Sequence, residues 1–139
     1  MTLPAAIPLD LRGRSLTRVR DWTPAELEAV LDLADELKEK QRQREPHRLL
    51  EGRTVGLLFR KHSTRTRVSL EVACAQLGAT ALYLPGEQLQ LARGESVADT
   101  ARVLSRYLDA VAIRTHEHAE VDAFAAAAGI PVLNALTAE

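Results

Sequence analysis

Short apolar runs alternate with amphipathic helical patterns along most of this chain, and this alternation constrains the fold more than any other feature. The apolar runs cover residues 54–59, 80–84, 110–114 and 129–134. Each has the length of a strand buried on both faces, and the stretches between them are long enough for helical crossovers. The pattern therefore predicts an α/β fold, with a parallel β-sheet of about four strands and helices on both faces.

The helical patterns have recognisable starts and ends. Thr23-Pro24-Ala25-Glu26 reads as a capping box with proline at the first helical position, and apolar spacing extends that helix over about residues 24–44. Further helices are expected over 66–77, ending at Gly78, and around 121–128. A helix beginning after Ser96 is expected to bury Val97, Ala101, Leu104 and Leu108. A polar loop is predicted from Pro85 to Gly94.

Composition limits the classes of function. The 139 residues suffice for one domain, and the net charge of -1 gives no support for a nucleic-acid partner. Cys74 is the only cysteine, so it forms no internal disulfide, and its helical spacing predicts a core position. No apolar run approaches membrane-spanning length, and the first residues, Pro-rich and then basic, are expected to form an extended lead-in without signal-peptide character. A cytoplasmic location is expected.

The segment after the first apolar run is rich in cations and hydroxyls. No Asp or Glu occurs between Gly52 and Leu70. A strand is predicted to end at Phe59 and a helix to begin within Ser63–Arg67, with the Ser63 side chain as its cap. Free amides, hydroxyls and guanidiniums at a helix start suit an anion the size of phosphate. An ordinary capped helix with surface arginines is the alternative.

Other charged residues are expected at the same edge of the sheet. Arg65 and Arg67 are two residues apart, so on a helix they point in different directions, and one is expected to face the ligand and the other the protein. Arg65 is the better ligand candidate because it lies nearer the turn. Arg114 ends the third apolar run, and ligands of parallel sheets lie beyond the carboxyl ends of strands. Gln90 and Arg93 lie in the loop after the second run, where simple exposure is the default.

The histidines carry a weaker signal. His116 and His118 have H-x-H spacing, but the nearest acids, Glu117 and Glu120, are expected to be helical and exposed, so no metal site is predicted. Neither a Walker loop nor a dinucleotide fingerprint occurs, and no Ser-His-Asp or Cys-His arrangement is readable.

Several motifs resemble those of the ornithine carbamoyltransferases. The family signature F-x-K-x-S-T-R-T-R is matched by Phe59–Arg67. The block R-G-E-s-x-x-D-T-A-R-V-L-S-R-Y-x-D-A is matched by Arg93–Ala110. Two shorter segments, Ile113–Thr115 and Val132–Thr137, also match, and the likeness covers nearly all of the chain from about Leu11.

The resemblance implies that residues 1–139 form a Rossmann-like carbamoyl phosphate-binding domain. Members of the family transfer the carbamoyl group of carbamoyl phosphate to ornithine, giving citrulline and phosphate. The phosphate would be held by Ser63, Thr64, Arg65 and Thr66. Thr66 and Arg114 would lie near the carbonyl oxygen, so Arg65, Thr66 and Arg114 are the catalytic candidates. Arg67 closes the motif at the same site and would support the loop.

The resemblance also implies partners. Gln90 matches a glutamine that reaches into a neighbouring subunit's site, which implies a homotrimer with shared active sites. The reaction needs no cofactor and no metal, because fixed cationic donors stabilise the charge that grows on the carbonyl oxygen and the departing phosphate.

Two features of the family pattern do not occur in these 139 residues. The family's H-P-x-Q motif would follow shortly after Glu139, and the ornithine-binding second domain with its H-C-L-P motif is absent. We therefore expect the chain alone to bind carbamoyl phosphate weakly without turning over.

Two alternatives stay open. One is a sister transcarbamylase that uses aspartate, putrescine or acetylornithine as acceptor. Lys61 and the Arg93–Ala110 block favour ornithine, and His62 stands where aspartate enzymes typically show proline. The other is a non-catalytic anion-binding or oligomerisation module.

Overall fold

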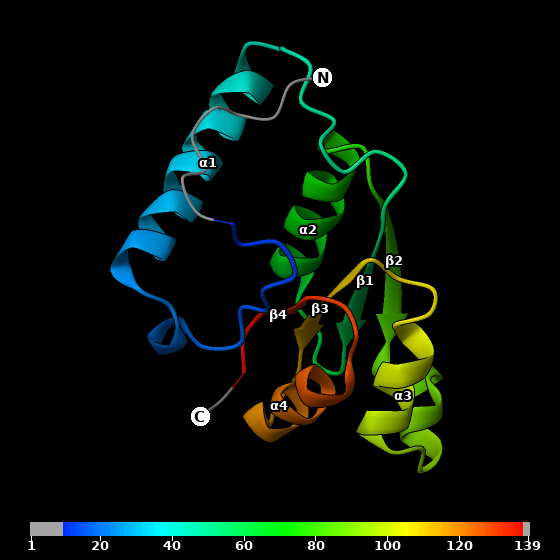
Figure 1. Ribbon diagram of the computed structural model, residues 1–139. Helices are drawn as coiled ribbons and strands as arrows, with labels where there is room; N and C mark the ends of the chain where they lie inside the picture. Colours follow the sequence, from blue (N-terminus) through cyan, green and yellow to red (C-terminus); the bar gives the residue numbers. More distant parts are fainter. Residues whose placement is uncertain (1–9, 138–139) are drawn as a thin grey trace.

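The computed structural model describes residues 10–137, which form a four-stranded parallel sheet with helices around it (Figure 1). Its strands are β1 Thr54–Phe59, β2 Thr80–Pro85, β3 Ala110–Arg114 and β4 Val132–Asn134, in the spatial order β2-β1-β3-β4. All four expected strands are present, and every neighbouring pair is parallel. The predicted fold class is confirmed.

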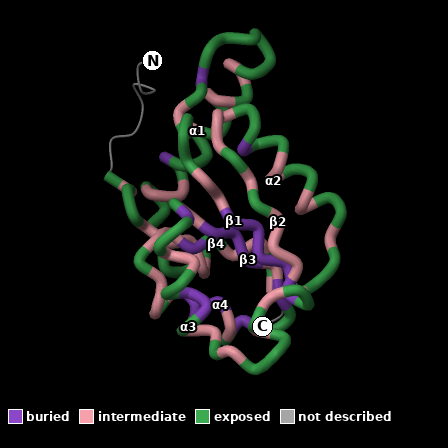
Figure 2. Tube along the Cα trace, turned by 90° about the vertical axis from the view of Figure 1, so that its right-hand side faces the viewer, coloured by how far each residue is buried: buried purple, intermediate pink, exposed green. Residues whose placement is uncertain are grey.

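Helices cover both faces of this sheet (Figure 2). On one face α2, Thr64–Gln76, joins β1 to β2. On the other face α3, Val97–Leu104, and α4, His118–Ala127, pack against each other. The chain moves outward from β1 to β2 and then crosses to β3 on the other side, so the strand order reverses between β1 and β3. A reversal of this kind opens a crevice at the carboxyl ends of the two strands.

Alternating side chains of the central strands contribute to two hydrophobic cores, one on each face of the sheet. Leu57 points to the α2 face, where it packs with Phe59 and Leu70, and Leu58 points to the opposite face. The larger core lies between the sheet, α3 and α4, and its buried members are Leu58, Ala101, Val111, Ile113, Val121, Phe124 and Val132. Burial on both faces explains why the strands read as continuous apolar runs.

The first helix, α1, runs from Pro24 to Arg42 and begins with the expected capping box. The Glu26 N–H donates to Thr23 Oγ1 at 3.2 Å, and the Thr23 N–H donates to Glu26 Oε2 at 2.9 Å. Arg44 has a φ of 57°, and the helix ends before this left-handed residue.

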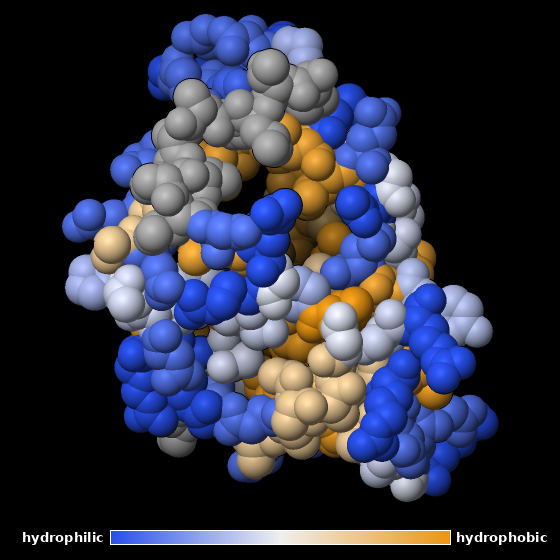
Figure 3. Space-filling model, viewed as in Figure 1, coloured by the Kyte–Doolittle hydropathy of each residue, from blue (hydrophilic) through white to orange (hydrophobic). Residues whose placement is uncertain are grey.

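Little of α1 is buried in the described part of the chain. Ala29 is its only buried residue, whereas Leu31 is 64% exposed. Hydrophilic side chains cover much of its outer surface, and apolar side chains gather in the hollow between α1 and α2 (Figure 3). The helix therefore leaves apolar surface that the rest of the described chain does not cover.

Several boundaries differ from the expectation. Helix α2 begins at Thr64 rather than Thr66. The predicted polar loop contains two 3₁₀ turns, Gly86–Gln88 and Gln90–Arg93, because the chain closes short-range backbone bonds there. The next helix, α3, stops at Leu104, although Leu108 is buried in the turn that follows. Strand β4 is shorter than expected.

The N-terminal segment borders the outer edge of β4. The Leu16 N–H donates to the Val132 carbonyl at 2.9 Å, and the Asn134 N–H donates to the Leu16 carbonyl at 2.8 Å. Ser15 Oγ accepts the Val132 N–H at 2.9 Å. These bonds satisfy part of an edge that would otherwise be open. The expected extended lead-in falls mostly on residues 1–9, which lie outside the described residues.

Cys74 is a core residue, as predicted. It is 7% exposed, and burial raises the pKa of its thiol, with the nearby Glu71 charge acting in the same direction. Among residues 10–137, no helix combines the length and apolar character that crossing a bilayer requires.

Gly78, just beyond the end of α2, is expected to resist substitution. Its φ is +86°, and an added Cβ would lie 3.2 Å from the Glu51 Cα. The Gly78→Ala variant is expected to lower the free energy of unfolding by about 1–2 kcal/mol. Urea unfolding measures this. Gly129→Ala is the matched control, since nothing lies within 4 Å there, and its effect should stay within about 0.5 kcal/mol. Equal effects at both positions would contradict the strain at Gly78.

Candidate anion-binding site

The predicted anion-binding residues lie at or just after the ends of two neighbouring strands, β1 and β3. Phe59, the last residue of β1, is in register with Arg114, the last residue of β3. The Arg60 N–H continues the pairing by donating to the Arg114 carbonyl at 2.8 Å. The basic loop and Arg114 therefore flank the point at which the strand order reverses, where α/β sheets hold their ligands.

The start of α2 supplies unpaired backbone donors. Its first backbone bond runs from the Arg67 N–H to the Ser63 carbonyl at 3.1 Å, so the N–H groups of Thr64, Arg65 and Thr66 precede it. Ser63 is the N-cap residue, with extended backbone, but the predicted side-chain cap is wrong. Its hydroxyl donates to Thr66 Oγ1 at 2.8 Å instead, which leaves the three amides available to an anion.

The cations of the signature divide into paired and unpaired side chains. Lys61 and Arg65 are exposed, and neither forms an ion pair with any acid in residues 10–137. Arg60 and Arg67 instead pair with Glu120 and Glu71. Only the unpaired cations have their charge available to a ligand.

Arg67 is held against the protein, on the side the sequence predicts. Its guanidinium lies 3.4 Å from the centroid of the Tyr83 ring, and its Nε is 3.5 Å from Glu71 Oε1. The Tyr83 ring meets Phe59 edge-on, with centroids 5.6 Å apart. This stack ties the first turn of α2 to β1 and β2 through a cation–π contact and an aromatic pair.

Arg114 is partly buried at the end of β3. Its Nη1 donates to the Ala135 carbonyl at 3.2 Å, and its buried Nε has no hydrogen-bond partner in the described structure. A buried donor without a partner is unusual in a folded protein. Arg114 therefore keeps donor capacity at the edge where the basic loop begins.

Gln90 and Arg93 are exposed on the second 3₁₀ turn, after β2. Within residues 10–137, no hydrogen bond joins either side chain to the basic loop or to Arg114. The single chain thus does not connect these two residues to the other predicted site residues.

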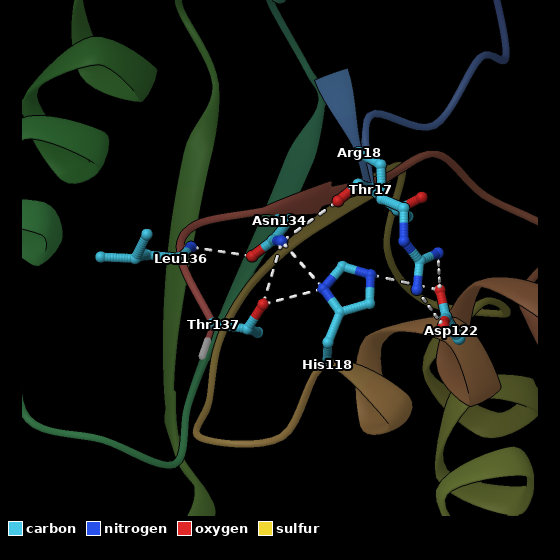
Figure 4. A network of polar contacts seen from close by, with 7 residues as sticks. All are labelled: Thr17, Arg18, His118, Asp122, Asn134, Leu136 and Thr137. Carbon is cyan, nitrogen blue, oxygen red and sulfur yellow. Dashed lines mark hydrogen bonds and ion pairs between the residues drawn. The ribbon is translucent and has the colours of Figure 1, made fainter. Parts of the chain in front are cut away.

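A pocket of about 580 Å³ lies beside the carboxyl end of β4, and no predicted phosphate-binding residue lines it. A polar network crosses its wall (Figure 4). Asn134 Nδ2 donates to the Thr17 carbonyl at 3.1 Å, and His118 Nδ1 lies 2.8 Å from Thr137 Oγ1. Arg18 pairs with Asp122 and holds the pKa of that carboxyl below its usual range. These bonds fix the turn that follows β4.

His116 and His118, which have H-x-H spacing, lie in different surroundings. His116 is exposed, and His118 is buried in the network of Figure 4, with Nε2 3.4 Å from Asp122 Oδ1. Within the described ranges, no cluster of three or more His, Cys, Asp or Glu side chains could hold a metal ion.

The exposure predicted for Glu120 is wrong. It was expected to be exposed, yet its side chain is 28% exposed and accepts hydrogen bonds from Arg60 Nη1 and Thr115 Oγ1. Sequence reasoning missed this contact because Arg60 and Glu120 are 60 residues apart and adjoin only once β1 and β3 pair. The sequence signal that could have predicted this ion pair is a cation directly after one strand together with an acid in the helix that follows the neighbouring strand.

Comparisons with known proteins agree with this geometry. The family model for the aspartate/ornithine carbamoyltransferase carbamoyl-P binding domain matches residues 14–139. An ornithine carbamoyltransferase of Pyrococcus abyssi is 52% identical over 93% of this chain and 41% of that protein. One from Anoxybacillus flavithermus is 50% identical over the same shares.

Solved structures give the same result. The ornithine carbamoyltransferase from Pyrococcus furiosus superposes with a TM-score of 0.89 at 50% identity, covering 93% of this chain and 41% of that one. An aspartate transcarbamoylase from Trypanosoma cruzi, in complex with carbamoyl aspartate and phosphate, gives 0.84 at 30% identity, covering 97% and 43%. The chain spans about two fifths of the length of the curated relatives it matches. With its motifs, its fold and these relatives in agreement, the chain belongs to the aspartate/ornithine carbamoyltransferase family and contains the family's carbamoyl phosphate-binding domain.

Proposed function

We propose that this chain is the carbamoyl phosphate-binding half of an ornithine carbamoyltransferase, which transfers the carbamoyl group to ornithine and releases citrulline and phosphate. One observation carries the proposal. The start of α2, just after β1 where the strand order reverses, has unpaired amides, and the neighbouring Lys61 and Arg65 have no acidic partner in residues 10–137. Such a site suits a dianionic phosphoryl group.

The residues divide the chemistry between the two ends of the substrate. Ser63, Thr64, Arg65 and Thr66 supply amides, hydroxyls and a guanidinium for the phosphate. Arg114, with donor capacity on Nε, and Thr66 would lie near the carbonyl oxygen. When the amine attacks the carbamoyl carbon, negative charge grows on this oxygen and on the leaving phosphate, and fixed donors stabilise both. Holding the two substrates in line supplies much of the remaining acceleration.

Ornithine is the proposed acceptor for two reasons. The relatives at 46–52% identity carry the name ornithine carbamoyltransferase, whereas the aspartate transcarbamoylase structures are 30% identical. His62 also stands where aspartate enzymes typically show proline. Acceptor-binding groups would come from a second domain, and Gln90, exposed on its turn, would reach a neighbouring subunit's site in a homotrimer. A cytoplasmic location is part of the same proposal, since Cys74 is the only cysteine.

The first test removes one guanidinium at a time. Arg65→Ala and Arg114→Ala are each expected to weaken binding of carbamoyl phosphate about ten- to one-hundredfold, because charge-assisted hydrogen bonds contribute about 1.5–3 kcal/mol. Titration calorimetry measures this affinity. Arg53→Ala removes the same charge at the amino end of β1, where Arg53 pairs with Asp109, and should bind nearly as wild type. Unaltered binding in both site variants would favour the anion-binding or oligomerisation module.

The second test concerns the stack under Arg67. Replacing Tyr83 by Leu removes the ring beneath the guanidinium, and we expect it to lower the free energy of unfolding by about 1–2 kcal/mol. Phosphate affinity should fall severalfold, because the first turn of α2 loses its tie to the sheet. Tyr83→Phe keeps the ring and should stay near wild type in both measurements. The role of the ring is refuted if the Leu and Phe variants behave alike in urea unfolding.

The third test uses the unmodified chain. Incubated with carbamoyl phosphate and ornithine, the 139 residues are expected to form no citrulline, because the family's ornithine-binding groups belong to the second domain. A colorimetric citrulline assay, calibrated with an intact ornithine carbamoyltransferase, decides this. Full turnover by the chain alone would show that the acceptor site lies within these residues.

A further inference from the structure

Arg60 forms contacts that reach three neighbouring strand ends. It follows β1 directly, and its N–H donates to the Arg114 carbonyl at the end of β3. Its Nη1 lies 2.5 Å from Glu120 Oε1 in α4, and Glu120 Oε2 accepts the Thr115 hydroxyl at 2.6 Å. The backbone bond connects Arg60 directly to the end of β3. The ion pair connects it to the same segment indirectly, because Glu120 also accepts a hydrogen bond from Thr115, the residue after Arg114.

The third strand end meets Arg60 from the other side. Gly86 follows β2 and is buried against Arg60, so that a Cβ at Gly86 would lie 2.6 Å from Arg60 Cγ and 3.2 Å from its Cα. Only a glycine fits this approach without displacing the arginine. Arg60 is thus wedged between the chain that leads to Gln90 and the chain that carries Arg114.

Arg60 is also poorly suited to binding the anion itself. Its guanidinium is paired with Glu120, and both side chains are about two-thirds buried, with exposed fractions of 32% and 28%. Releasing Arg60 to a ligand would leave the largely buried Glu120 carboxylate without its cation. The pair instead cancels a charge beside the site while fixing the geometry there.

We infer that the Arg60–Glu120 pair is a positioning brace, which sets the spacing between the basic loop after β1 and Arg114 at the end of β3. The inference rests on the proposed function for its consequence, since these two segments carry the groups assigned to the phosphate and the carbonyl oxygen. Arg60 and Glu120 act through the loop and Arg114 and touch no reacting atom.

The experiment uses the full 139-residue chain without ligand. Amide hydrogen exchange is measured by NMR for wild type, Arg60→Gln, Glu120→Gln and the double variant. We expect the Arg60 amide, which donates to the Arg114 carbonyl, to exchange about tenfold faster in each single variant. The double variant should exchange no faster than the faster single variant, because both substitutions break one interaction. Arg60→Lys, which keeps a cation for Glu120, should recover part of the protection.

Two controls separate a brace from general destabilisation. Arg53→Gln breaks the exposed Arg53–Asp109 pair at the opposite end of β1 and should leave the Arg60 amide unchanged. The Val111 amide, which lies within β3 and donates to the Pro131 carbonyl, reports global opening and should exchange at similar rates in all brace variants. Wild-type exchange of the Arg60 amide in both single variants, or single effects that add in the double variant, would overturn the brace.

A second measurement links the brace to ligand binding. Titration with inorganic phosphate and with carbamoyl phosphate should give dissociation constants raised about three- to tenfold in each single variant, again without addition in the double variant. Dissociation constants equal to wild type despite faster exchange would overturn the positioning role. If wild type itself binds neither ligand, the proposed function fails, whereas the exchange data still support or overturn the brace.

Discussion

Repulsion among cations is the constraint on which the carboxyl edge of this sheet depends. Arg60, Lys61, Arg65 and Arg67 fall within eight residues that contain no acid, and Arg114 adjoins them through β3. The fold offsets part of this charge with two acids, Glu120 from α4 and Glu71 one turn further along α2. Lys61 and Arg65 stay without an acidic partner in residues 10–137, and both are exposed. Folding therefore decides which arginines are paired with acids and which keep their charge uncompensated.

Strand order makes that division possible. Because β1 lies between β2 and β3, the chain after Phe59 meets elements of both neighbours at once. Tyr83 of β2 lies under Arg67, and Arg114 of β3 accepts the Arg60 N–H. A hairpin order would place the successive strand ends at opposite edges and separate these groups. The parallel arrangement instead places the ends of β1 and β3 side by side, at the edge where the first turn of α2 presents its amides.

Sequence reasoning reached the parts of this structure that are local. The bounds of β1 and β3 and the capping box of α1 follow from apolar runs and from residues within one turn of each other. The expected side-chain cap at Ser63 was wrong, because the Ser63 side chain is turned toward the Thr66 hydroxyl, to which it donates, and accepts no backbone N–H. The exposure expected for Glu120 was wrong for a different reason, since its partner Arg60 becomes adjacent only through strand pairing.

The different roles of Arg65 and Arg67 depend partly on local sequence and partly on contacts that only the fold creates. Their spacing alone predicts that they point apart, but it does not say which one meets the protein. The choice of Arg67 depends on Tyr83, whose ring is brought under α2 by the β1–β2 register. Which residues would bind the anion stays a prediction, since a site is defined by its ligand as well as by its donors.

Arg114 depends on a second set of contacts, on the far side of the crevice. Its Nη1 is held by the Ala135 carbonyl, and the position of that carbonyl is set by the turn after β4. That turn includes Leu136 with a φ of 114°, a costly conformation for a branched residue. Asn134 offsets the cost by accepting the Leu136 N–H at 2.8 Å and by donating to Thr17.

The orientation of Arg114 is therefore determined from both ends of the chain. The N-terminal segment fixes Asn134 through Thr17, Asn134 fixes the strained turn, and the turn fixes one face of the guanidinium. On the other side, the Arg60 brace fixes the Arg114 backbone. With the backbone and Nη1 both committed to the protein, Nε is left as the buried donor. A donor held in this way does not have to reorganise when charge develops on an oxygen, which is the condition under which electrostatic stabilisation is most effective.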